Sequence, residues 1–314
     1  MRKYAWLSAV IVTLILPYLA YRIAEDIVLQ EDPAQPLTVA TEPEEVRSQH
    51  KIVVLENGTP VSMDLETYTS RVLLAEMPAS FDMEALKAQA VAIRTYTLRQ
   101  ASGGKHENAD VCTDSSCCQA YKTEADYTEG EEMLARIQKA VEKTKDQVLV
   151  YDGGLIEATY FSSTGGSTED AVAVWGREVP YLRAQPSPEG KSDKFLETVT
   201  FSATQVQQLL ELDALPASVG SVTYTDGGGV DSICIGNKTF TGTEVRKKLG
   251  LSSTAFLITI VGDSVTITTK GNGHRVGLSQ YGAEVMAVEG SMYYEILEYY
   301  YPGAKLTTLD EYWV

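Results

Sequence analysis

The alternation of apolar and polar residues along the chain predicts a mixed α+β fold. Two short apolar runs, residues 52–55 and 61–63, flank Asn57-Gly58, a pair typical of the tight turn of a β-hairpin. The apolar positions then change to helical spacing from Leu65 onward. The sequence therefore predicts a hairpin that leads into a helix.

The segment RVLLAEMPASFDMEALKAQAVAIRTY, residues 71–96, contains the junction of two helices. The first helix is expected to end near Glu76, because the residue before Pro78 disfavours the helical conformation. Asp82 is a favourable N-cap for the second helix, whose apolar pattern continues to about Gln100.

The rest of the chain alternates short strands with helices around glycine-rich turns. Strands are expected at 148–153, 155–163, 196–201, 221–225, 231–235 and 256–269, and helices at 131–146, 204–211, 243–249 and 291–301. We expect one α+β domain, residues 51–314, with mainly antiparallel strands and a groove.

The N-terminus predicts a membrane anchor over residues 1–22. Arg2 and Lys3 precede an uncharged run of 18 residues, Tyr4 to Tyr21, which at 1.5 Å per residue spans roughly 27 Å, enough for a bilayer core. Residues 23–50 are acidic and carry three prolines, as a linker does. The charge order places the domain outside the cytoplasm. A cleaved signal peptide is the alternative.

The composition limits the partners. The chain has 26 Lys+Arg against 43 Asp+Glu, a net charge of -17. This excess of negative charge argues against nucleic acid or an anionic membrane surface as a ligand, but not against a neutral glycan.

Glu76 has two interpretations. A carboxylate in the last turn of a helix faces the negative end of the helix dipole, and its apolar neighbours Leu73, Leu74 and Met77 add desolvation. Both effects favour the protonated acid, as a general acid near neutral pH requires. An exposed acid that closes a helix fits the same residues, and the local sequence does not separate the two.

The alanine-rich helix that follows carries three side chains capable of directed hydrogen bonds, Gln89, Arg94 and Tyr96, and these are candidates for substrate binding in the groove. Ordinary surface polarity explains Gln89 equally well. Arg94 stands among apolar residues, and a buried arginine needs a carboxylate or carbonyl partner.

The segment KHENADVCTDSSCCQAY offers four ligands suited to tetrahedral zinc, His106, Cys112, Cys117 and Cys118. A structural metal ion is the first interpretation. A Cys112–Cys118 disulfide and a free thiol cluster are the alternatives, and adjacent cysteines do not easily ligate one ion together.

Residues 271–282, GNGHRVGLSQYG, form a loop whose glycines permit close approach of a ligand. The candidates for substrate binding in the groove from this loop are His274, Gln280 and Tyr281. Those from the predicted strand over 155–163 are Tyr160 and Ser162. A serine hydrolase using Ser279 or Ser162 is a weak alternative, because the chain has no G-x-S-x-G elbow.

Several blocks together resemble the stage II sporulation protein D family, which includes the amidase enhancers of the LytB type. These blocks are LLAEMP with EALKAQAVAIRTY, STGGSTEDAVAVWG, YLRAQPSPEG, GTEVRKKLGLSST, and GNGHRVGLSQYGAEVMA with YYEILEYYYPGAKL. The resemblance implies a lytic transglycosylase that cleaves the bond between N-acetylmuramic acid and N-acetylglucosamine and closes a 1,6-anhydro ring. It makes Glu76 the acid/base. No second acid accompanies Glu76 in these blocks.

The resemblance also implies a zinc ion held by His106, Cys112 and Cys118. Cys117 stands where related sequences often have His, and Phe161 where some have His. Arg275 replaces an expected glycine, and we expect it to crowd the loop that faces substrate.

The implied partners are denuded peptidoglycan strands, the cell-wall amidase stage II sporulation protein P and the membrane protein stage II sporulation protein M, during engulfment of the forespore. A non-catalytic glycan-binding protein that stimulates an amidase is the alternative function.

Overall fold

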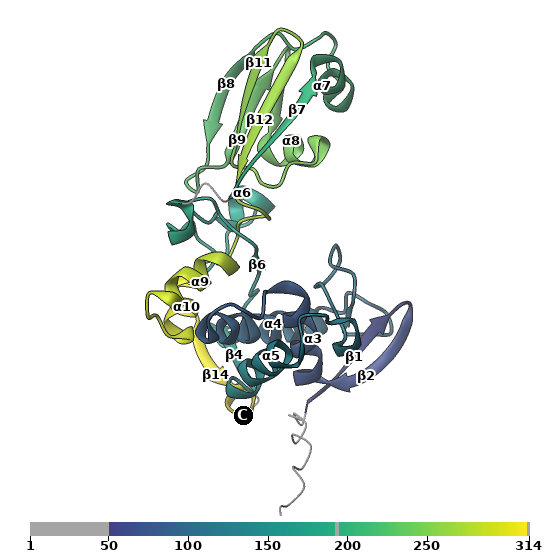
Figure 1. Cartoon of the computed structure of the whole chain (residues 1–314), viewed down its shortest axis with the longest axis vertical. Helices are drawn as coiled ribbons and strands as arrows, with labels where there is room; N and C mark the ends of the chain where they lie inside the picture. Colours follow the sequence, from purple (N-terminus) through teal and green to yellow (C-terminus); the bar gives the residue numbers. More distant parts are fainter. Residues whose placement is uncertain (1–49, 192–194, 313–314) are drawn as a thin grey trace, which may run out of the picture. The chain divides into compact units, whose positions relative to one another are not determined.

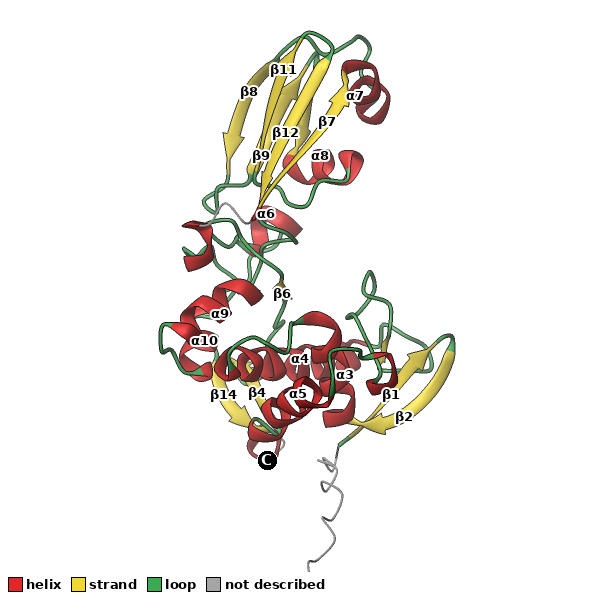
Figure 2. Cartoon of the chain, in the orientation of Figure 1, coloured by secondary structure: helices red, strands yellow, loops and turns green. Residues whose placement is uncertain are grey.

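The computed structural model describes residues 50–191 and 195–312 (Figure 1). The predicted anchor, and the predicted linker apart from its last residue, lie outside the described residues. Over the part that is described, no helix is long and apolar enough to cross a membrane. The fold is α+β with mainly antiparallel strand pairs, as the apolar pattern predicts (Figure 2).

The predicted hairpin is present. Strand β1 (Lys51–Glu56) pairs antiparallel with β2 (Thr59–Asp64), and both residues of the turn, Asn57 and Gly58, have positive φ angles of 49° and 83°. The short strand β3 (Val111–Cys112) pairs parallel with β1 on its other edge. This pairing fixes the start of the cysteine segment against the hairpin.

Three helices form the centre of the N-terminal half of the fold: α3 (Leu65–Glu76), α4 (Met83–Gly103) and α5 (Glu131–Lys143). Helix α4 contacts both of the others and also the C-terminal helices α9 and α10. It is able to pack on several sides because much of its surface is alanine, and small side chains let neighbouring backbones approach closely. The expected break between α3 and α4 at Pro78 is confirmed.

Two small sheets combine strands that directly follow α5 with strands from the C-terminal part of the chain. Strand β4 (Gln147–Tyr151) pairs antiparallel with β5 (Gly154–Leu155) and with β14 (Lys305–Thr308). The expected single strand over 155–163 is wrong: it is broken, and β6 (Tyr160–Phe161) pairs parallel with β13 (Leu278–Ser279). This parallel pair brings the glycine-rich loop beside Tyr160.

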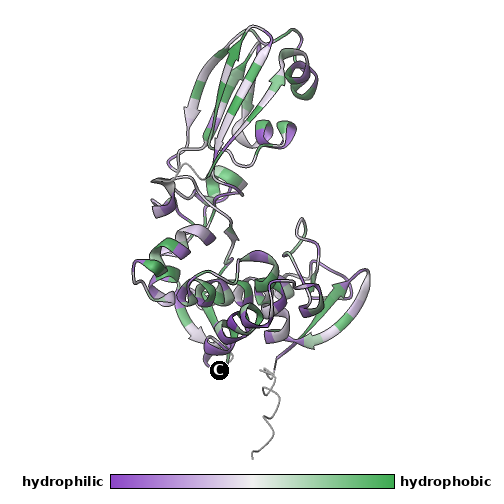
Figure 3. Cartoon of the chain, in the orientation of Figure 1, coloured by the Kyte–Doolittle hydropathy of each residue, from purple (hydrophilic) through white to green (hydrophobic). Residues whose placement is uncertain are grey.

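Residues 196–270 have an apolar core of their own, made from two three-stranded sheets and two short helices. Apolar and polar positions alternate along these strands (Figure 3). The elements are β7 (Leu196–Ser202), α7 (Ala203–Leu210), β8 (Val219–Tyr224), β9 (Val230–Ile235), β10 (Lys238–Thr241), α8 (Gly242–Leu249), β11 (Phe256–Val261) and β12 (Ser264–Lys270). Strand β10 was not predicted. The strand predicted over residues 256–269 is instead an antiparallel hairpin of two strands, β11 and β12.

The C-terminal part returns to α4. The remaining helical elements are η2 (Glu124–Asp126), α6 (Ala171–Trp175), η3 (Pro188–Lys191), α9 (Gln280–Val288), α10 (Tyr293–Tyr300) and α11 (Leu309–Tyr312). Helix α9 begins directly after β13 and contacts α4, so the end of the glycine-rich loop is held next to the end of α3.

Candidate active site

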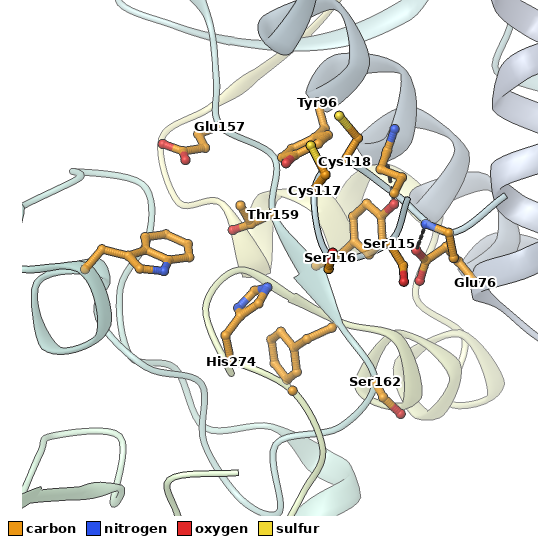
Figure 4. Close-up of a pocket in the computed structure, with 16 residues that line it drawn as sticks. Glu76, Tyr96, Ser115, Ser116, Cys117, Cys118, Glu157, Thr159, Ser162 and His274 are labelled. Atoms are coloured by element: carbon orange, nitrogen blue, oxygen red, sulfur yellow. Dashed lines mark hydrogen bonds between the residues drawn. The ribbon is translucent and has the colours of Figure 1, made fainter. Parts of the chain in front are cut away.

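A cavity of about 540 Å³ lies where the end of α3, helix α4, the cysteine segment and the glycine-rich loop meet (Figure 4). Its walls come from segments that are far apart in the sequence. The lining residues are Glu76, Tyr96, Ser115, Ser116, Cys117, Cys118, Gln119, Ala120, Glu157, Thr159, Tyr160, Phe161, Ser162, Trp175, Gly273 and His274.

Glu76 is the last residue of α3 and its side chain lines this cavity. One carboxylate oxygen, Oε1, accepts the backbone N–H of Ala120 at 2.9 Å, and Oε2 accepts the side-chain amide of Gln280 at 3.4 Å. Desolvation by burial raises the pKa of Glu76 above its usual value, and these two hydrogen bonds only partly oppose the rise. The environment of Glu76 therefore favours the protonated form of its carboxyl group.

The local sequence explains how Glu76 reaches this position. Asp64 begins α3 by accepting two backbone N–H groups, which fixes the register of the helix. Twelve residues later the helix ends, and Met77 takes an extended conformation before Pro78. The side chain of Glu76 is therefore held at the negative end of the helix dipole, which also disfavours its charged form.

Two tyrosines form the wall beside Glu76. The rings of Tyr96 and Tyr160 meet edge to face, with centroids 6.5 Å apart. The Tyr160 hydroxyl donates to Gln119 Oε1 at 2.8 Å, and the Gln119 amide donates to Thr97 and Tyr68. Burial raises the pKa of Tyr96 to about 12 and that of Tyr160 well above its usual value, so both are neutral donors.

His274 faces the cavity between two aromatic rings, Phe161 and Trp175, each with its centroid 5.6 Å away. Its Nδ1 accepts the backbone N–H of Val276 at 3.1 Å. Burial, followed by the charge of Arg246, lowers the pKa of His274 to about 4. The imidazole is therefore neutral at physiological pH and serves as a polar wall residue.

Ser162 also lines the cavity, whereas Ser279, the other serine considered as a hydrolase nucleophile, does not. Ser279 is fully buried, and its hydroxyl donates to the Glu189 carboxylate at 2.6 Å. His274 is tied to the backbone through Nδ1 and does not activate this serine.

Four residues that were predicted to lie in the groove are absent from the cavity lining. Arg94 is fully buried and paired with Glu66, with Nη2–Oε2 at 2.5 Å, so its expected carboxylate partner is present and it is not exposed to substrate. Gln89 is also fully buried. Tyr281 lies between the rings of Phe81 and Phe195. Gln280 donates to the Glu76 carboxylate and is 5% exposed, so it acts through that carboxylate.

The prediction that Arg275 crowds the substrate loop is wrong. Its side chain is 2% exposed and pairs with Glu169 at 3.1 Å, while its other nitrogen donates to the carbonyl oxygens of Ser167 and Gly227. Arg275 adopts φ of 67°, so the backbone keeps a conformation that favours glycine. The buried ion pair joins the glycine-rich loop to the segment STGGSTED.

The cysteine segment contains a group of four possible metal ligands. The ligand atoms of His106, Cys112, Cys117 and Cys118 all lie within 4.8 Å of one another, and the cysteines are free thiols. The Cys112–Cys118 disulfide is therefore absent from this segment. Cys117 lies with the other three potential ligands, so the two adjacent cysteines are both near the centre of the group.

The donor set fits zinc. Tetrahedral zinc with bonds of about 2.0–2.3 Å holds its ligands roughly 3.5 Å apart, so these four atoms need only close slightly around an ion. Cys117 and Cys118 also line the cavity, and Ala120, two residues later, donates to Glu76. An ion in this cluster would fix the loop that positions Glu76.

Sequence reasoning missed several lining residues. Glu157 and Trp175 lie on the cavity wall, and Figure 4 shows Glu157 across the site from Glu76. Glu157 pairs with Arg177, whose guanidinium also lies over the Trp175 ring with its carbon 6.0 Å from the ring centroid. In the sequence, Glu157 is distinguished only as an acidic residue within the apolar run LIEATYF. Trp175 is distinguished only by the glycine that follows it.

A family model and several related proteins that match this chain indicate the same protein family. A family model described as "Stage II sporulation protein" matches residues 58–151. Stage II sporulation protein D of Bacillus subtilis (strain 168) is 40% identical, over 81% of this chain and 77% of the relative. The protein of the same name from Bacillus amyloliquefaciens is 38% identical, over 82% and 78%. An amidase enhancer of Bacillus subtilis is 32% identical, over 76% of this chain and 40% of that protein. The chain belongs to the stage II sporulation protein D family.

Proposed function

We propose that this chain is a peptidoglycan lytic transglycosylase that acts on glycan strands stripped of stem peptides. The observation that carries this proposal is Glu76, a carboxyl group with a raised pKa on the wall of a cavity rich in hydroxyl and aromatic groups. Such a lining suits a sugar, because it combines apolar faces with many neutral hydrogen-bonding groups.

Glu76 performs both proton transfers. Protonated Glu76 donates its proton to the glycosidic oxygen as the bond from C1 of N-acetylmuramic acid to that oxygen breaks. The resulting carboxylate then takes the proton of the sugar's own 6-hydroxyl as O6 bonds to C1. The products are a free 4-hydroxyl and a 1,6-anhydro ring, no water is consumed, and Glu76 ends protonated.

The groups around Glu76 assist both proton transfers. The Ala120 N–H and the Gln280 amide stabilise the carboxylate once the first proton has left. Burial opposes the charge, so the second transfer, which restores the neutral acid, is favoured. Tyr96, Tyr160, Ser162 and His274 supply the wall against which the sugar binds.

We also propose that His106, Cys112, Cys117 and Cys118 hold one structural zinc ion, and that residues 1–22 anchor the domain outside the cytoplasm. Stage II sporulation proteins P and M are the partners that the family resemblance suggests. The amidase would remove stem peptides before this chain cuts the strand during engulfment.

The test is product analysis on intact and denuded peptidoglycan, with wild type beside Glu76→Gln. Wild type should release 1,6-anhydromuramyl products from denuded strands, and Glu76→Gln should release almost none while keeping its fold. Equal release by the variant would refute the assignment of Glu76.

A second function is favoured by one observation, the 32% identity to an amidase enhancer. In that case the cavity grips glycan and stimulates a partner amidase without cutting the strand. Glycan binding without anhydro products, and amidase stimulation that survives Glu76→Gln, would support this second function.

A further inference from the structure

The side of the cavity across from Glu76 carries an exposed aromatic ring. Trp175 is the last residue of α6, and Gly176 ends the helix in a left-handed conformation with φ of 72°. The Trp175 side chain is 37% exposed and lines the cavity, beside the neutral His274 ring. An open aromatic face with polar neighbours is a surface on which the apolar face of a pyranose ring can stack.

A cation lies at the same place. Arg177 follows the turn at Gly176 and lies between two lining residues: its guanidinium is over the Trp175 ring and pairs with Glu157. Arg177 is 54% exposed and Glu157 22% exposed. An ion pair with this exposure is weak because solvent screens it, and a guanidinium has five N–H donors. Arg177 can therefore donate hydrogen bonds to a second carboxylate in addition to that of Glu157.

The lining itself contains no lysine or arginine among the described residues, so Arg177 supplies positive charge to this wall. Each N-acetylmuramic acid carries a lactyl group. In a strand with stem peptides the lactyl carbonyl is a neutral amide, whereas removal of the peptide leaves a carboxylate. A planar guanidinium recognises that carboxylate with paired hydrogen bonds and gains much less from the amide.

We propose that Trp175 and Arg177 form the subsite for one N-acetylmuramic acid unit, with the pyranose stacked on Trp175 and the free lactyl carboxylate bound by Arg177. This inference rests on the proposed function and names the side chain that selects denuded strands. Glu157 is a positioning residue here: it orients Arg177 and does not touch the reacting atoms.

The test uses matched strands that differ only at the lactyl group, one set with free carboxylates and one with the same carboxylates converted to simple amides. Wild type should prefer the free carboxylate. Arg177→Gln should raise KM for it by on the order of tenfold, the usual cost of a lost charged hydrogen bond, with little change in kcat. Both proteins should act equally on the amidated strands, and Arg177→Lys should restore part of the preference.

The matched control is Arg183→Gln. Arg183 is 44% exposed and pairs with Asp170 at 3.5 Å, and it is absent from the cavity lining. This variant should keep the wild-type preference. If Arg177→Gln keeps it as well, the subsite is refuted while the proposed function stands.

Binding measured separately distinguishes the two proposals. Glu76→Gln protein should bind free-carboxylate strands more tightly than amidated ones, and the added Arg177→Gln change should abolish the difference. If wild type makes no anhydro product but this binding difference is found, the proposed reaction is wrong and the subsite is supported. If the doubly changed protein keeps the difference, the subsite is wrong.

Discussion

The two carboxylates of the cavity lie in contrasting regions. Glu76 ends a helix, is held by a backbone N–H and a neutral amide, and has a pKa raised by burial. Glu157 lies across the cavity, in an ion pair with the exposed Arg177 beside Trp175. The same chemical group is thus buried among neutral donors in one place and held in a partly exposed ion pair in the other, and the proposed roles of the two carboxylates follow from these neighbours.

The largest expected effect separates the two acids directly. Glu76→Gln should lower turnover by on the order of 10³-fold, within the range for loss of a general acid/base. Glu157→Gln should lower it by less than about tenfold, because it removes an exposed ion pair that does not transfer a proton. Initial rates on denuded strands, with thermal unfolding as the check on folding, measure both. Equal losses would mean that both carboxylates take part in the chemistry.

The pH dependence of kcat/KM tests the Glu76 side of the cavity alone. Because burial raises the pKa of Glu76, its acid form persists above the usual carboxyl range and is lost as pH rises through that pKa. The value of kcat/KM should therefore fall at high pH, by about tenfold per unit above the pKa. His274, with a pKa of about 4, should add no step between pH 5 and 8. A profile with an inflection that disappears in His274→Gln would contradict this account.

Removal of the proposed zinc ion should affect the Glu76 end of the cavity more than the Trp175 end. Chelation or Cys118→Ser should release the zinc, lower the unfolding temperature and reduce turnover on the order of tenfold, because the loop that carries the Ala120 N–H loses its support. Elemental analysis beside unfolding and activity measurements checks this. Cys234→Ser is the control, since Cys234 lies in β9 outside the cluster. Purified protein without zinc would rule out the site.

The smallest expected effect concerns the wall that the two regions share. Tyr160→Phe keeps the ring but removes the donor to Gln119 Oε1. The unfolding free energy should fall by about 1–2 kcal/mol, since a buried acceptor loses its partner, with little change in KM. Tyr224→Phe is the control, because Tyr224 is 58% exposed. A large change in KM for Tyr160→Phe would show that its hydroxyl binds the sugar.

The structural features that depend on local sequence could be predicted. Asn57-Gly58 determined the hairpin turn, Asp64 the start of α3, and Pro78 its end, so the helix-end position of Glu76 followed from nearby residues alone. These signals act within a few residues, where turn and capping chemistry dominate.

The parts that depend on distant contacts could not be predicted. Arg94 was expected to need a carboxylate or carbonyl partner, but nothing in the pattern identified Glu66, 28 residues earlier. Arg275 has its partner Glu169 106 residues away, and this pairing turned an expected obstruction into a buried support. Glu157 lies where the predicted strand over 155–163 is broken, and Trp175 reaches the cavity from helix α6, which was not predicted.

The most direct test of the central claim is the reaction of denuded strands in water enriched in ¹⁸O. If Glu76 transfers the proton to the leaving oxygen and then takes it from the sugar's own 6-hydroxyl, mass spectrometry should find unlabelled 1,6-anhydromuramyl ends with wild type and almost none with Glu76→Gln. Muramyl reducing ends that carry ¹⁸O as the initial product, or undiminished anhydro ends with Glu76→Gln, would contradict the account.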